Sequence, residues 1–115
     1  MTESQRTAPE LFDLSGHVAV ITGGGRGIGE GIATAFAESG AAVVVAARRT
    51  GEIERVAADI REAGGRAIAV TTDVTDDDAV EALAQAAIDE FGSLTIWVNN
   101  AGGSPMRMPP VSYTH

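Results

Sequence analysis

Five glycines lie within residues 23–29, directly after an apolar run over residues 18–21. Glycine permits positive φ and has no Cβ, so an anionic group can approach the backbone of such a turn. The helix expected to follow would offer that anion free N–H groups and the positive end of its dipole. This order of strand, glycine turn and helix favours a site for the phosphates of a nucleotide. The alternative is a plain tight turn, which glycines also form.

Arginines lie close to this turn in the expected fold. Arg26 lies inside the turn, and Arg48 and Arg49 follow the second apolar run. Guanidinium groups bind phosphates through forked, charge-assisted hydrogen bonds. A carboxylate at the end of the second strand would bind the ribose 2′-hydroxyl of NAD and repel the 2′-phosphate of NADP, but Ala47 stands there. We therefore predict a preference for NADP(H), with NAD(H) as the second option; solvated surface charges are the alternative interpretation of Arg48 and Arg49.

Alternating strand and helix patterns surround these residues. Strand-like runs cover residues 17–22, 42–46, 67–71 and 94–98. Three amphipathic helical patterns separate them and end before Gly40, Gly64 and Gly92, where glycine permits a left-handed turn. The order predicts an α/β fold with a Rossmann-type doubly wound parallel sheet, truncated after about the fourth strand. Ligands of such sheets lie beyond the carboxyl ends of the strands.

The chain divides into three segments in this interpretation. Residues 1–15 form a flexible lead-in, residues 16–105 a nucleotide-binding half-domain and residues 106–115 an irregular tail. Thr75 is expected to cap the third helix, with three aspartates following it in the first turn.

Composition limits the partners of the chain. It has 115 residues, and all eight basic residues are arginines, against sixteen acidic residues and a net charge of −8. This balance disfavours nucleic acid and anionic membranes as partners. The chain has no cysteine, so a thiolate metal site is excluded and a reducing compartment is permissive. No apolar run approaches the roughly 20 residues of a membrane span, and we expect a cytoplasmic protein without a metal.

Three motifs resemble those of the short-chain dehydrogenase/reductase family. They are the pattern Thr22-Gly23-x-x-x-Gly27-Ile28-Gly29, the pair Asp73-Val74 and the run Asn99-Asn100-Ala101-Gly102. The resemblance covers residues 14–105 and implies the strand order 3-2-1-4. Methyltransferases, another nucleotide-binding class with this architecture, have a different glycine pattern.

The resemblance also implies roles for individual residues. Gly23 would make the tight turn, Gly27 and Ile28 would lie along the pyrophosphate, and Gly29 would let the helix pack closely on the strand. Asp73 and Val74 would lie against the adenine. The alternative for Asp73 is the start of a turn or a cap before the third helix, and binding and capping are compatible. Asn100, Ala101 and Gly102 would line the side of the adenosine ribose. Asn99 has two open interpretations, a cofactor contact or a structural link between strand ends.

The family's catalytic groups are a serine and a Tyr-x-x-x-Lys pair in the second half of the domain. This chain has no lysine, and its single tyrosine, Tyr113, follows the asparagine motif closely. We assign no catalytic role to the neighbouring Ser112, Tyr113 and His115, because acid–base catalysis needs fixed positions. The chain is therefore interpreted as the cofactor-binding half of an oxidoreductase that interconverts a carbonyl and a secondary alcohol.

The function of this half has alternatives, and its edge strand suggests how it associates. It could instead be a non-catalytic dinucleotide-binding module, or a subunit completed by another chain. Its fourth strand, residues 94–98, would form an open apolar edge, so we expect self-association. The identity of the small-molecule substrate does not follow from these residues.

Overall fold

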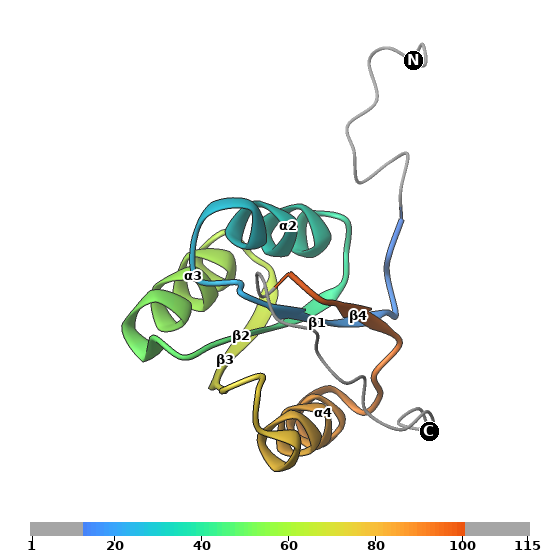
Figure 1. Cartoon of the computed structure of the whole chain (residues 1–115). Coiled ribbons are helices and arrows are strands. Elements are labelled where there is room, and N and C mark those ends of the chain that lie inside the picture. Colours follow the sequence, from blue (N-terminus) through green and yellow to red (C-terminus); the bar gives the residue numbers. More distant parts are fainter. Residues whose placement is uncertain (1–12, 101–115) are drawn as a thin grey trace, which may run out of the picture.

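The computed structural model describes residues 13–100, which form a four-stranded parallel sheet with three helices (Figure 1). The strands are β1 (Val18–Thr22), β2 (Ala42–Ala47), β3 (Arg66–Thr71) and β4 (Ile96–Val98). The helices are α2 (Gly27–Glu38), α3 (Thr50–Glu62) and α4 (Asp77–Phe91). The sheet order is β3-β2-β1-β4, which confirms the predicted fold class and strand order.

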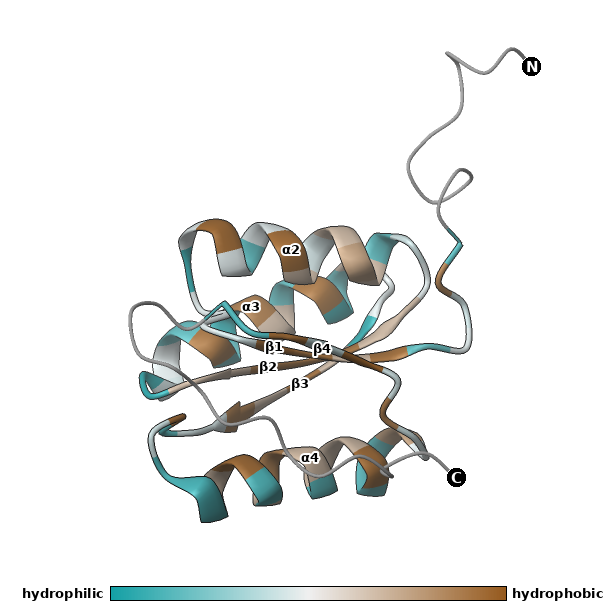
Figure 2. Cartoon of the chain, turned by 45° about the vertical axis from the view of Figure 1, so that its right-hand side comes forward, coloured by the Kyte–Doolittle hydropathy of each residue, from teal (hydrophilic) through white to brown (hydrophobic). Residues whose placement is uncertain are grey.

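The helices cover both faces of the sheet. Helices α2 and α3 lie on one face and α4 lies on the other (Figure 2). Successive side chains of β1 and β2 therefore enter two separate cores. Ile21 and Val45 pack with Ile53 of α3, whereas Val20 packs with Leu83 of α4. This two-sided burial explains why both central strands are almost continuously apolar.

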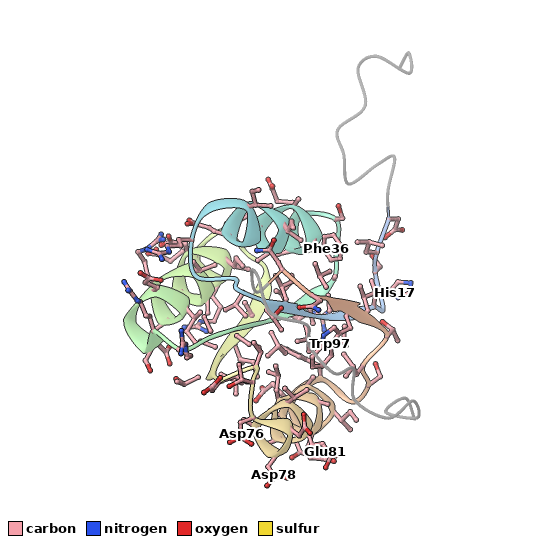
Figure 3. The ribbon with its side chains drawn as sticks, viewed as in Figure 1. His17, Phe36, Asp76, Asp78, Glu81 and Trp97 are labelled. Atoms are coloured by element: carbon pink, nitrogen blue, oxygen red, sulfur yellow. The ribbon has the colours of Figure 1, made fainter. Side chains whose placement is uncertain are left out.

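The start of α4 differs from the prediction. Asp76, rather than Thr75, is the N-cap residue, and its carboxylate accepts hydrogen bonds from the backbone N–H groups of Asp78 and Ala79. The Thr75 hydroxyl instead donates to the carboxylate of Asp73 at 2.6 Å. Asp76 and Asp78 both lie at the start of α4 in Figure 3. The predicted role of the acidic run, which is to stabilise the first turn, agrees with this arrangement.

Strand β4 is shorter than the predicted residues 94–98. The Thr95 hydroxyl accepts a hydrogen bond from the backbone N–H of Val18 at 3.0 Å, and it lies 3.0 Å from Nδ1 of His17. The Thr95 side chain thus accepts the hydrogen bond of the Val18 N–H group. If β4 were longer, this N–H group would pair with a backbone carbonyl oxygen of β4 instead. His17 is exposed directly before β1, at the end of this strand opposite the glycine turn (Figure 3).

Trp97 of β4 packs on the α4 side of the sheet (Figure 3). Among residues 13–100, no helix has the length and hydropathy needed to cross a membrane.

Candidate functional site

A pocket of about 420 Å³ opens at the carboxyl ends of the strands. The glycine turn after β1, the segment joining β2 to α3, the segment joining β3 to α4 and the residues after β4 contribute to its wall. Its lining residues are Gly23, Gly25, Arg26, Ala47, Arg48, Arg49, Glu52, Thr72, Asp73, Val74, Thr75 and Asn100. The fold therefore brings together seven of the residues predicted to bind the cofactor: Gly23, Arg26, Arg48, Arg49, Asp73, Val74 and Asn100.

The glycine turn is tied to the neighbouring strand. The N–H groups of Gly23 and Gly24 both donate to the carbonyl oxygen of Ala46, at 2.8 and 3.3 Å. Gly23 and Gly27 have φ values of +66° and +60°, which favour glycine at both positions. Helix α2 begins at Gly27, after the N-cap residue Arg26. Because an arginine side chain has no acceptor for the first N–H groups of the helix, this terminus suits an anion.

Gly29 lets α2 approach β1 closely. A Cβ at this position would overlap the carbonyl oxygen of Gly23 and lie 2.7 Å from Nδ2 of Asn100. Gly29 is buried, whereas Ile28 beside it is 76% exposed, next to the pocket. Neither Gly27, Ile28 nor Gly29 lines the pocket itself.

Thr22 connects the ends of β1 and β4. Its buried hydroxyl accepts a hydrogen bond from the backbone N–H of Asn100 at 2.9 Å. The hydroxyl also lies 3.3 Å from the carbonyl oxygen of Val98 and 3.4 Å from Oδ1 of Asn99, either of which can accept its proton. The Asn100 amide donates to the carbonyl oxygen of Gly23 at 3.4 Å. These contacts give Asn99 and Asn100 a structural role; Ala101 and Gly102 lie outside the described residues.

The arginines share the pocket wall with Glu52. The Glu52 carboxylate lies 3.6 Å from Nη1 of Arg49 and 4.0 Å from Nη1 of Arg26. Both arginine side chains are more than two-thirds exposed, at 70% and 72%, and are accessible to a ligand. Ala47, at the end of β2, brings no carboxylate to the pocket. Sequence reasoning missed Glu52, although its place three residues after Arg49 at the start of a helix is a signal for an ion pair.

Asp73 closes a turn on its own segment. Its carboxylate accepts hydrogen bonds from the hydroxyl of Thr75 at 2.6 Å and from the Thr75 backbone N–H at 2.9 Å. These two hydrogen bonds, together with the positive charge of Arg48, lower the pKa of Asp73 below its ordinary value of 3.8. Asp73 therefore carries a negative charge at neutral pH. This geometry agrees with the alternative interpretation of Asp73, which is that it begins a turn.

The described part of the chain has no cluster of metal-binding side chains. Residues 13–100 hold no group of three or more His, Asp or Glu side chains that could bind a metal ion. The pocket instead offers the guanidinium groups of Arg26, Arg48 and Arg49, and α2 begins directly after Arg26. This donor set suits a phosphorylated ligand.

Most of the chain is similar to known dehydrogenases. Residues 17–113 match the family model described as short chain dehydrogenase. The chain is 42% identical over 103 residues to 7alpha-hydroxysteroid dehydrogenase of Escherichia coli, covering 87% of this chain and 40% of that protein. It is 49% identical over 92 residues to cis-4-hydroxycyclohexanecarboxylate dehydrogenase of Sinomonas cyclohexanicum, covering 80% and 36%.

The fold is also similar to that of a solved dehydrogenase structure. The crystal structure of hydroxysteroid dehydrogenase from Escherichia coli superposes with a TM-score of 0.78 at 42% identity, covering 90% of this chain and 45% of that one. The chain thus spans less than half the length of these relatives.

Proposed function

This chain belongs to the short-chain dehydrogenase/reductase family, and we propose that it is the NADP(H)-binding half of an oxidoreductase. The reaction is the interconversion of a carbonyl and a secondary alcohol, in which the nicotinamide supplies or accepts a hydride. The binding unit we propose is residues 16–105. We assign no catalytic residue to this chain, and we propose a small molecule as its substrate.

The observation that carries the cofactor preference is the charge around the end of β2. Ala47 leaves this end without a carboxylate, and Arg26, Arg48 and Arg49 line the same pocket. A 2′-phosphate would meet guanidinium groups there, whereas the 2′-hydroxyl of NAD(H) would find no carboxylate acceptor at Ala47. NAD(H) remains the second cofactor, because the glycine turn suits the pyrophosphate of both.

We assign other residues to the pyrophosphate, the adenine and the ribose of the dinucleotide. The N–H groups after Gly24 and the N-terminus of α2 suit the pyrophosphate, beside Gly27, Ile28 and Gly29. We assign Asp73 and Val74 to the adenine, and Asn100, Ala101 and Gly102 to the ribose side.

Titration of the full chain with NADPH and NADH tests this proposal, with Arg48→Asp as the critical variant. A lost guanidinium–phosphate contact is worth about 1.5–3 kcal/mol, so NADPH should bind roughly 10- to 100-fold more weakly while NADH changes little. Arg66→Asp is the matched control, because Arg66 begins β3 and does not line the pocket. Equal binding of NADPH and NADH to the unaltered chain would contradict the proposed preference.

A second candidate function is that of a subunit or binding module completed by another chain. Strand β4 has one neighbour, β1, within residues 13–100, and its three residues are only half-buried. An apolar edge of this kind favours pairing with a further strand. We propose that this edge mediates self-association or the docking of a completing chain.

A further inference from the structure

Glu52 occupies a central place among the charges of the pocket. Its carboxylate lies 4.0 Å from a guanidinium nitrogen of Arg26, in the glycine turn, and 3.6 Å from one of Arg49, at the start of α3. One carboxylate thus faces two arginines from different segments. Both are arginines that we propose surround the 2′-phosphate.

The backbone around Glu52 limits where this carboxylate can lie. A Cβ added to Gly25 would lie 3.0 Å from Cβ and 3.2 Å from Oε1 of Glu52, so the glycine turn packs directly against this side chain. Glu52 also lies in the first turn of α3, where the exposed N–H groups of the helix favour a negative charge. Its side chain is 32% exposed, against 72% for Arg26, so it is the more fixed partner.

The Glu52 carboxylate lowers the net positive charge of the pocket. The charged lining residues are three arginines and two acids, so their net charge is +1. Asp73, the other acid, accepts two hydrogen bonds from Thr75 and interacts with the positive charge of Arg48. Glu52 is the counter-charge of Arg26 and Arg49, and its removal would raise the sum from +1 to +2.

We infer that Glu52 is a specificity-determining residue that limits the affinity of the pocket for a 2′-phosphate. This inference rests on the proposed NADP(H) function. Both ion pairs lie at the surface, with guanidinium groups that are 72% and 70% exposed, and such pairs are weak. A phosphate with forked hydrogen bonds can therefore displace them. The carboxylate nevertheless stays close to the bound phosphate, because the glycine turn and α3 hold it there. Its repulsion acts on NADPH and spares NADH, which has no phosphate at this position.

The test is Glu52→Gln, which removes the charge and keeps the shape of the side chain. The dissociation constant for NADPH should fall about three- to tenfold, with a change below about twofold for NADH. The salt dependence of NADPH binding should become steeper, because one more cationic charge acts on the phosphate. Glu52→Ala should shift both quantities in the same direction.

Glu54→Gln is the matched control, because Glu54 lies exposed on the same helix and does not line the pocket. Thermal unfolding of each variant establishes that it is folded. Unchanged or weaker NADPH binding by folded Glu52→Gln, in a chain that still prefers NADPH, would overturn the inference alone. A chain without any preference for NADPH would overturn the proposed function, and the inference with it.

Discussion

The backbone N–H of Asn100 donates to the buried hydroxyl of Thr22 at 2.9 Å, joining the carboxyl ends of β4 and β1. Asn100 lines the pocket, and its amide also reaches the carbonyl oxygen of Gly23 in the glycine turn. A single threonine therefore links the outer strand of the sheet to the segment that we assign to the pyrophosphate.

Thr22→Val should destabilise the fold and weaken cofactor binding together. Valine has the same shape but leaves the part-buried N–H of Asn100 without its acceptor, which costs about 1 kcal/mol, the lower end of the range for buried groups. Urea unfolding measures this loss. Thr34→Val is the control, since Thr34 is exposed on α2, and its free energy of unfolding should stay within about 0.5 kcal/mol of the original. Equal stability of both variants would contradict the role given to Thr22.

Gly29→Ala and Gly31→Ala should have opposite effects, although both lie in α2. A Cβ at Gly29 meets the carbonyl oxygen of Gly23, so we expect a loss of about 1–3 kcal/mol in the free energy of unfolding. A Cβ at Gly31 meets nothing within 4 Å, so alanine there should stabilise the chain by about 0.4–1 kcal/mol. Urea unfolding of the two variants distinguishes close packing from general helix propensity. Equal shifts would refute the packing role.

Asp73 should titrate below 3.8, and Thr75→Val should raise its pKa toward that value, because the hydroxyl donor is lost. A pKa lowered by folding stabilises the native state above the unfolded value, and this contribution disappears as pH falls through the folded pKa. The unfolding free energies of the original chain and Thr75→Val should therefore converge below pH 3.8. NMR titration of the Asp73 carboxyl measures the pKa directly; identical values in the two chains would disprove the assignment.

The open edge of β4 should make the chain self-associate. Light scattering over a range of concentrations should show a mass that rises with concentration, because the half-buried strand has only β1 as a neighbour in the described part of the chain. A monodisperse monomer at high concentration would rule this expectation out.

The sequence was sufficient to predict the order of the elements because the local signals agree. The apolar runs of β1 and β2, the helical stripes and the glycines after each helix all indicate the same boundaries. The helix stops at Gly40, Gly64 and Gly92 have positive φ values, as predicted.

Competition between neighbouring polar residues limited the prediction elsewhere. Thr75 and Asp76 are both good helix caps, and only the fold shows that Asp73 takes the Thr75 hydroxyl and leaves the cap to Asp76. In the same way, the side chain of Thr95 shortened β4. Glu52 was missed, because its contact with Arg26 joins residues that are distant in sequence.

The most direct test of the proposed NADP(H) site is ³¹P NMR of NADPH as the full chain is added. The 2′-phosphate signal is separate from the pyrophosphate signals, so it reports on this one group. Binding as proposed shifts or broadens the 2′-phosphate signal, and Arg48→Asp abolishes that change. Perturbed pyrophosphate signals with an unchanged 2′-phosphate signal would contradict the proposed phosphate contact, and no change in any signal would contradict dinucleotide binding by this chain.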